Sequence, residues 1–196
     1  MNKTLEIDGK QYSFGSDGAV YVPSQNDNNP GNTNPGSTDP GNTDTGNAGQ
    51  YTADQGDLDM YNKAQMYNSD TDYIIITNKT KHLVNIYRGP KGARVLEQSF
   101  VCTVGAARSQ TIEGEFKVGT KLYYFDSGSC RVFYATRIKG AYFFHSILYY
   151  QTRTPQRVMD GRLGMNLSHG CVRLGLDQAK WIYDNIPIGT KIVIYK

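Results

Sequence analysis

The 196-residue sequence lacks any apolar run long enough to cross a membrane, since a spanning helix needs about 18 such residues. The first ten residues lack the apolar core of a signal peptide, so we expect any export signal to lie upstream of Met1. Cysteine and histidine are scarce, with three of each, and none of the cysteines has a partner at a zinc-ligand spacing. We therefore expect neither a membrane span nor a metal site.

Each part of the chain is also poor in charge of one sign. Residues 1–71 carry three lysines against ten acidic residues, whereas residues 72–196 carry eighteen Lys or Arg against eight acidic residues. The basic part should attract a polyanionic partner. No nucleic-acid-binding motif accompanies this charge, so we do not expect nucleic acid to be that partner.

Composition divides the chain into three parts. Residues 1–22 contain two short alternating strands on either side of residues 15–18, which predicts a hairpin. Residues 23–56 are rich in Pro, Gly, Asn and Thr, repeat with a period of five from Pro30, and have too few apolar groups to fold. They predict a flexible linker, and residues 57–196 predict one folded domain.

Hydrophobic patterns in that domain predict mostly β-structure. We expect helices at 57–68 and 177–185, the second stopped by Pro187, and strands at 73–77, 83–87, 95–104, 115–118, 131–136, 142–145 and 191–195. Many short strands with one late helix predict a mainly β, sandwich-like fold.

The run Ser168-His169-Gly170-Cys171-Val172-Arg173 is the best candidate for a catalytic site. A thiol outside any metal motif can act as a nucleophile if a base takes its proton. Glycine permits a tight turn whose N–H groups, at Gly170 and Cys171, could bind a developing oxyanion. Ser168 and His169 would shape that turn. The alternative is a simple turn with a buried thiol.

Three histidines compete for the role of base. His82 precedes a strand and receives no role, and His169 lies only two residues before the thiol. His145 ends the aromatic strand 142–145, where a rigid element can fix its ring. We therefore expect His145 to be the base. Without the cysteine run, a histidine in this position would indicate a structural role.

The run 168–173 resembles the active-site signature of the L,D-transpeptidase catalytic domain, the YkuD-like family. Residues 143–146 resemble the upstream histidine element of that family, residues 111–116 its Thr-x-x-Gly-x-Phe segment, and residues 189–194 its closing strand. The resemblance covers residues 72–196. Twenty-two residues separate His145 from Ser168, several more than the family pattern, so we expect a different lid over the thiol.

The resemblance implies a β-sandwich-like catalytic domain with a helix after Cys171. It implies that Cys171 is the nucleophile, that His145 is the base, and that the Ser146 carbonyl orients the imidazole. The expected substrate is a peptidoglycan tetrapeptide stem, which would lose its terminal D-Ala, pass through a thioester and form a 3–3 cross-link without a cofactor. An L,D-carboxypeptidase with the same site and a non-catalytic wall-binding protein are the alternatives. The resemblance also implies action outside the cytoplasm, at the cell wall.

Residues near the signature are candidates for substrate binding. Arg173 could hold a substrate carboxylate, or could pair with Asp177 instead. Tyr149 and Tyr150 begin the segment that we expect to form the lid, which runs to Gly164. Its arginines, at positions 153, 157 and 162, could attract anionic stems or could simply be solvated.

Two further features stay open at this point. Residues 5–21 resemble one unit of a choline- or glucan-type wall-binding repeat, although the usual tryptophan is missing. Cys102 and Cys130 could form a disulfide or remain two buried thiols.

Overall fold

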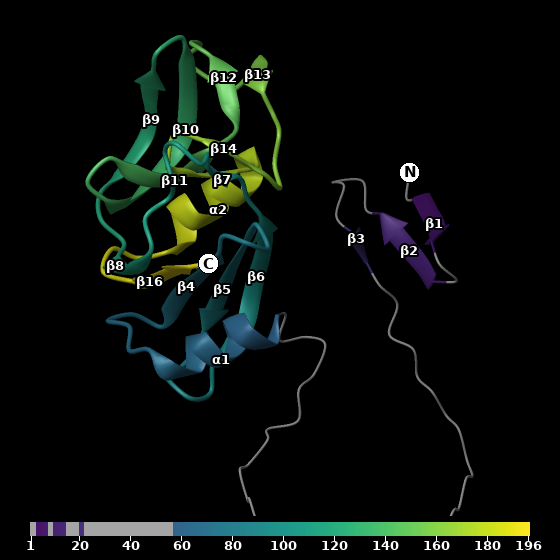
Figure 1. Ribbon diagram of the computed structural model, residues 1–196, viewed down its shortest axis with the longest axis vertical. Coiled ribbons are helices and arrows are strands. Elements are labelled where there is room, and N and C mark those ends of the chain that lie inside the picture. The colour runs from purple at the N-terminus through teal and green to yellow at the C-terminus, as the bar shows by residue number, and fades with distance from the viewer. Residues whose placement is uncertain (1–2, 8–9, 15–19, 22–56) are drawn as a thin grey trace, which may run out of the picture. The chain divides into compact units, whose positions relative to one another are not determined.

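The computed structural model describes residues 3–7, 10–14, 20–21 and 57–196 (Figure 1). These residues belong to two compact units, which are described separately. The predicted linker at 23–56 lies outside the described residues. Within the described ranges, no helix is both long and apolar enough to cross a membrane.

The first unit contains a small antiparallel sheet. Strands β1 (Lys3–Ile7), β2 (Lys10–Phe14) and β3 (Val20–Tyr21) pair in the order β1-β2-β3. Strands β2 and β3 pair on either side of residues 15–18, which confirms the predicted hairpin. The sequence predicts two strands here and the structure has three, because β1 pairs with β2.

The second unit contains two large sheets and one two-stranded sheet. The five-stranded sheet has the order β6-β5-β4-β16-β8, with strands β6 (Val95–Val101), β5 (Leu83–Arg88), β4 (Tyr73–Asn78), β16 (Lys191–Tyr195) and β8 (Gly114–Lys117). The other sheet has the order β13-β12-β10-β11-β15, and β9 also pairs with β10. Its strands are β13 (Val158–Asp160), β12 (Leu148–Tyr150), β10 (Cys130–Lys139), β11 (Tyr142–Ser146), β15 (Val172–Leu174) and β9 (Lys121–Ser127).

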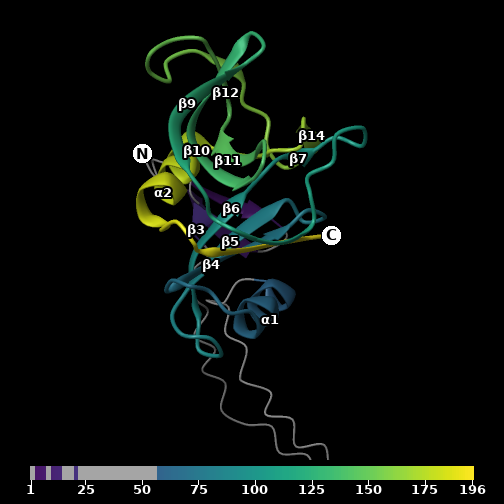
Figure 2. The ribbon, with the colours of Figure 1, turned by 90° about the vertical axis from the view of Figure 1, so that its left-hand side faces the viewer.

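Helix α1 (Leu58–Met66) covers one face of the five-stranded sheet (Figures 1 and 2). It begins at Asp57, whose carboxylate accepts a hydrogen bond from the Met60 N–H at 3.1 Å. Side chains alternate between the two faces of a strand. Accordingly, a set of residues from α1 and alternate strand positions forms one apolar cluster: Met60, Ala64, Ile74, Ile76, Tyr87 and Val193.

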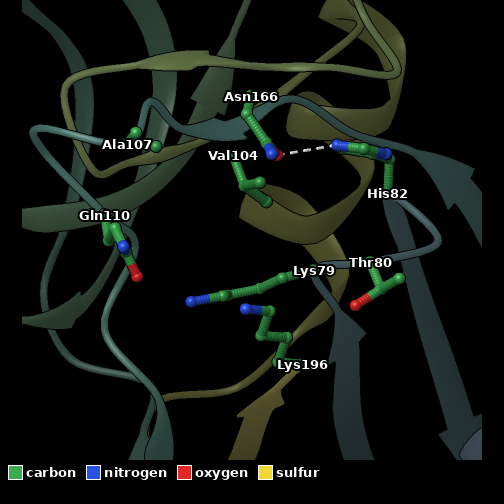
Figure 3. Close-up of a pocket in the computed structure, with 9 residues that line it drawn as sticks. Lys79, Thr80, His82, Val104, Ala107, Gln110, Asn166 and Lys196 are labelled. Atoms are coloured by element: carbon green, nitrogen blue, oxygen red, sulfur yellow. Dashed lines mark hydrogen bonds between the residues drawn. The ribbon is translucent and has the colours of Figure 1, made fainter.

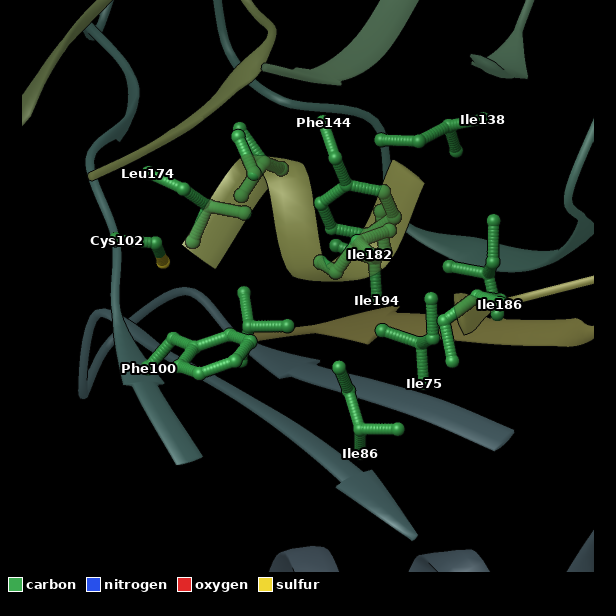
Figure 4. Packing of buried hydrophobic residues seen from close by; sticks show 14 of the residues in the cluster. Ile75, Ile86, Phe100, Cys102, Ile138, Phe144, Leu174, Ile182, Ile186 and Ile194 are labelled. Carbon is green, nitrogen blue, oxygen red and sulfur yellow. The ribbon is translucent and has the colours of Figure 1, made fainter. Parts of the chain in front are cut away.

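Helix α2 (Leu176–Asn185) lies between the two sheets, and its apolar side fills the main core (Figures 1 and 4). Ile182 on α2 packs in one cluster with Ile75 and Ile86 of the five-stranded sheet and with Phe144 of the other sheet. The predicted mainly β fold with a helix after Cys171 is therefore confirmed. Both faces of β4 are buried, which explains its uninterrupted run of isoleucines at positions 74–76.

The predicted strand at 95–104 is two strands, β6 and β7 (Val104–Gly105). The Cys102 N–H bonds the His82 carbonyl, and Thr103 then exchanges two backbone hydrogen bonds of 2.8 Å with Arg173. The chain thus leaves the edge of β5 and reaches the other sheet. Strand β7 then pairs in parallel with β14 (Asn166–Ser168) in a separate two-stranded sheet.

The structure also answers the question left open for the cysteines. Cys102 and Cys130 are both buried and both free, so no disulfide joins them. Cys102 belongs to the main core, where burial raises the pKa of its thiol to about 12. A thiol in that environment is inert at neutral pH.

Candidate active site

Strands β11 and β15 place the two candidate catalytic residues on one face of the sheet. They pair in parallel, with Phe144 opposite Val172 and His145 opposite Arg173. Directly paired side chains share a face, and successive side chains alternate. Phe144 and Val172 enter the core with α2, so His145 and Arg173 point away from it. Cys171, one residue before β15, is on the face of His145.

A cavity of about 120 Å³ opens on this face. Five predicted site residues line it: His145, Ser168, His169, Cys171 and Arg173. The remaining wall comes from β9, β10 and the start of β12, through Phe125, Ser127, Cys130, Val132 and Leu148. The structure therefore brings His145 together with residues of the run 168–173, which lie up to 28 positions later in the sequence.

The turn before Cys171 is fixed by the buried side chain of Ser168. Its hydroxyl accepts a hydrogen bond from the Gly170 N–H at 3.1 Å and donates one to the Cys171 carbonyl at 2.6 Å. Gly170 has φ +117°, and a Cβ there would lie 2.7 Å from Cε1 of Tyr142, so only glycine fits. In this resting geometry the Gly170 N–H is bonded to Ser168, and its role as an oxyanion donor stays a prediction.

His145 is buried, with its ring edge-on to Phe125 at a centroid distance of 5.9 Å. Its Nδ1 lies 2.6 Å from the Ser146 carbonyl oxygen. A carbonyl can only accept, so Nδ1 carries the proton and Nε2 holds the free lone pair. The Ser146 hydroxyl in turn accepts from the Phe133 N–H and donates to the Ile147 carbonyl, which fixes the end of β11.

Both candidate catalytic groups are neutral at rest. Burial lowers the pKa of His145 to about 4; the hydrogen bond to Ser146 opposes this shift and the charge of Arg173 adds to it. Burial raises the pKa of the Cys171 thiol, and a backbone hydrogen bond from Phe143 opposes that shift. The arrangement favours a thiol beside a neutral imidazole over a resting thiolate–imidazolium pair.

Arg173 forms an ion pair across the site, with Asp160 of β13 and not with Asp177. Its Nη1 donates to Asp160 Oδ2 at 3.0 Å, and Arg162 also bonds the same carboxylate. These hydrogen bonds hold the pKa of Asp160 well below its usual range, the larger contribution coming from Arg162. The Arg173 side chain is almost fully buried and its Nε has no hydrogen-bond partner within the described residues.

The expected lid segment contains the hairpin of β12 and β13 at the edge of the sheet. Tyr149 is buried, with its ring 5.5 Å from Phe133, and Tyr150 is exposed beneath the guanidinium of Arg157 at 4.3 Å. Neither tyrosine lines the 120 Å³ cavity. Their contact with a substrate stays a prediction.

Sequence reasoning missed several residues of this site, and three of them bear on its chemistry. Asp160 gave no signal, because its pairing with Arg173 depends on the register of β12 and β13. Phe125 belongs to β9, which was not predicted. Cys130 was considered only for a disulfide, whereas its thiol lines the cavity and bonds the Ser127 carbonyl at 2.9 Å.

A buried imidazole and a thiol line the same cavity, and these are the types of side chain that nucleophilic acyl transfer needs. Across the described part of the chain, no cluster of three or more His, Cys, Asp or Glu side chains could hold a metal ion. The family of L,D-transpeptidase catalytic domains named YkuD matches residues 72–194. The chain belongs to that family.

The chain is also similar to individual proteins. The chain is 42% identical over 55 residues to "Putative L,D-transpeptidase YciB" of Bacillus subtilis strain 168, a match that covers 28% of each protein. A solved structure of a fused Zn-dependent amidase/peptidase/peptidoglycan-binding domain-containing protein from Clostridium acetobutylicum ATCC 824 is similar at a TM-score of 0.57 and 40% identity. That match covers 68% of this chain and 57% of the other.

A structure of the L,D-transpeptidase LdtMt1 in complex with imipenem shares the fold at a TM-score of 0.51. Identity is 21%, and the match covers 63% of this chain and 59% of LdtMt1. The chain therefore matches less than two thirds of the length of each of these three proteins.

Proposed function

We propose that this protein is a peptidoglycan L,D-transpeptidase that forms 3–3 cross-links through a thioester on Cys171. The observation that carries the proposal is the placement of Cys171 and His145 in one cavity, with the His145 Nδ1 held by the Ser146 carbonyl. That hydrogen bond leaves Nε2 free to act as a base. Membership of the L,D-transpeptidase family supplies the substrate class.

The first half-reaction transfers an acyl group to the thiol. His145 Nε2 takes the Cys171 proton while the sulfur attacks the carbonyl of the third stem residue, an L-configured centre, of a tetrapeptide. The imidazolium then protonates the nitrogen of the terminal D-Ala, which leaves as the C–N bond breaks. Because the resting pair is neutral, proton transfer and attack occur together, and a lone thiolate does not need to persist in the buried cavity.

The second half-reaction forms the cross-link. The side-chain amine of the third residue of another stem attacks the thioester carbonyl, and His145 takes one proton from that amine. The C–S bond breaks and the proton returns to the sulfur, which restores the thiol. Neither half-reaction uses a metal or an organic cofactor.

The oxyanion in both steps requires hydrogen-bond donors. The Cys171 N–H is the first donor in this proposal, since the Gly170 N–H bonds Ser168 at rest. In other acyltransferases one such donor contributes about 3 kcal/mol. Release of the Gly170 N–H from Ser168 when substrate binds would add a second donor.

Arg173 lines the cavity, and its buried Nε lacks a partner among the described residues, which suits a substrate carboxylate or carbonyl. Tyr149, Tyr150 and the arginines of the β12–β13 segment would cover or attract the stem. The excess of basic residues in 72–196 favours the polyanionic cell wall. We accordingly place the enzyme outside the cytoplasm, at the wall.

The other parts of the chain have a role in this proposal. Residues 1–22 would be one unit of a wall-binding repeat, and residues 23–56 a tether that lets residues 57–196 reach substrate around that anchor. Deleting residues 1–56 should leave the rate on soluble stems unchanged and weaken retention on purified cell walls. Equal retention of both forms would contradict the anchoring role.

The experiment incubates the protein with purified disaccharide-tetrapeptide and measures cross-linked dimer, tripeptide and free D-Ala by mass spectrometry. The proposal predicts dimer and D-Ala from the wild-type protein and neither from Cys171→Ala. Tripeptide and D-Ala without dimer would identify the L,D-carboxypeptidase alternative. No product from a folded wild-type protein would favour a non-catalytic wall-binding protein.

A further inference from the structure

A second and larger cavity, of about 440 Å³, lies beside the strands that lead to the nucleophile turn (Figure 3). Its lining comes from five segments: the turn between β4 and β5, strand β7, the loop after β7, strand β14 and the residue after β16. This volume falls within the range of small-ligand sites, about 300 to 1,000 Å³. No residue of this cavity was assigned a role from the sequence.

Two lysines give this cavity its charge. The Nζ atoms of Lys79 and Lys196 point into the same space, toward Gln110 (Figure 3). Lys79 is buried and held in place, since its Nζ bonds the Thr111 carbonyl at 2.9 Å and pairs with Glu113 at 2.7 Å. Lys196 has no ion pair within the part of the chain that the structure describes. The Lys196 ammonium therefore remains available to a negatively charged group of a ligand.

Neutral polar groups complete the lining. The Asn166 side chain is fixed by a 2.8 Å hydrogen bond between its Oδ1 and Nε2 of His82. Because the Asn166 oxygen accepts that bond, its NH₂ group remains available to donate to a ligand. The Gln110 amide and the Thr80 hydroxyl also face the cavity (Figure 3). Such donors around ammonium groups match a carboxylate attached to a peptide.

The cavity and the nucleophile turn share one wall. The loop after β7 carries Gln110 on the cavity side, and on its other side it bonds the Ser168 carbonyl through the Ala106 N–H at 2.9 Å and the Ser109 hydroxyl at 3.1 Å. Asn166 precedes Cys171 by five residues, so their Cα atoms are at most about 18 Å apart. The free carboxylates of an acceptor stem lie on its third residue or on a neighbouring residue, so at most one residue of chain, about 3.6 Å, plus the third side chain separates the anchored carboxylate from the attacking amine. We propose that this short span carries the amine from the cavity to a thioester on Cys171.

The geometry points to a binding site for the acceptor. The cavity of Lys79, Lys196, Gln110 and Asn166 holds a carboxylate of the second stem peptide while the side-chain amine of that peptide attacks the thioester on Cys171. This inference rests on the proposed function and adds to it the place where the second substrate binds. In this arrangement the reacting amide of the donor stem lies in the 120 Å³ cavity that contains Cys171, and the two stems approach the turn from different sides. Water would replace the acceptor amine whenever this second site is empty.

The kinetic test measures dimer formation at saturating donor while the concentration of a disaccharide-tripeptide acceptor is varied. Lys196→Glu should raise the KM for the acceptor by about tenfold or more, the loss expected when one charge-assisted hydrogen bond becomes a repulsion. Lys91→Glu, which makes the same charge change in the turn between β5 and β6, should leave this KM unchanged. The rate of Cys171 acylation by imipenem should be equal in all three proteins.

A change on the ligand side completes this test. An acceptor whose carboxyl groups are amidated should show the same KM with the wild-type protein and with Lys196→Glu. Equal KM values of both proteins for the unmodified acceptor would overturn the inference, and so would a matching KM increase in Lys91→Glu.

A binding experiment separates this inference from the proposed function. Isotope-labelled Cys171→Ala protein, which cannot turn over, is titrated with the disaccharide-tripeptide and followed by NMR. Shifts should concentrate at Gln110, Asn166 and Lys196 even if the wild-type protein forms no dimer. Shifts confined to the Cys171 cavity would contradict the inference. Stronger competition by oligomeric glycerol phosphate than by the peptide would assign the site to a phosphate polymer and overturn it as well.

Discussion

Lowering the pH from 7 to 5 should destabilise the catalytic unit through His145. The pKa of this residue is about 4 in the folded protein against 6.5 for an ordinary histidine, because burial disfavours the charged ring. A folded-state pKa below the unfolded one gives stability that is present above pH 6.5 and is lost as the pH falls toward 4. Linkage gives a loss in the free energy of unfolding of about 2 kcal/mol between pH 7 and 5, and about 3 kcal/mol at pH 4.

The assay is urea unfolding at several pH values, followed by tryptophan fluorescence. The sequence has one tryptophan, Trp181 on α2, whose ring contacts Tyr73 and Phe100 edge-on, so the signal reports on the core between the two sheets. His145→Gln removes the titrating ring and serves as the reference. The wild-type protein should lose about 2 kcal/mol more than this variant between pH 7 and 5. Equal losses in the two proteins would refute the buried neutral imidazole.

Three further predictions follow from the turn and its surroundings. Gly170→Ala should lower the free energy of unfolding by about 2 kcal/mol and should reduce kcat. The backbone conformation at this position is unfavourable for alanine, and the alanine Cβ would meet Tyr142. An unchanged urea midpoint and an unchanged kcat would contradict this prediction. Asp160→Asn leaves the buried Arg173 charge unpaired, so the free energy of unfolding should fall by about 3 kcal/mol. The control is Asp126→Asn, which removes the acidic partner of an exposed ion pair. Equal losses of stability in the two variants would argue against the buried ion pair. Peptide-resolved iodoacetamide labelling of Cys171 should keep accelerating above pH 8.5, since burial raises its pKa, and a plateau by pH 7 would indicate a resting thiolate.

Local patterns predicted the elements with a strong local signal. The isoleucine-rich β4 and the helices α1 and α2 all depend on neighbouring residues, and each was found. Strands β12 to β15 have only three residues each and exist because distant segments pair with them. The break between β6 and β7 depends on Thr103 reaching Arg173, which no local pattern contains.

The site residues also differ in whether the sequence could predict them. Cys171 and His145 could be proposed because their surroundings carry a recognisable motif, and alternation along β11 and β15 then explains why they share a face. Asp160 could not be proposed, since one acidic residue in a loop-like segment has no distinguishing pattern. The position of α2 between the two sheets was likewise invisible, because an apolar helix side does not specify what it packs against.

The most direct test of the central claim is intact-protein and peptide mass spectrometry after incubation with a carbapenem. This β-lactam mimics the acyl donor, so the account predicts one inhibitor per protein, attached to the peptide that contains Cys171. Cys130 lines the same cavity and is the internal control, because its thiol donates to the Ser127 carbonyl and has no role in the proposed mechanism. Cys171→Ala should remain unmodified, whereas an adduct on Cys130, or an unmodified wild-type protein after prolonged incubation, would contradict the assignment of Cys171 as the nucleophile.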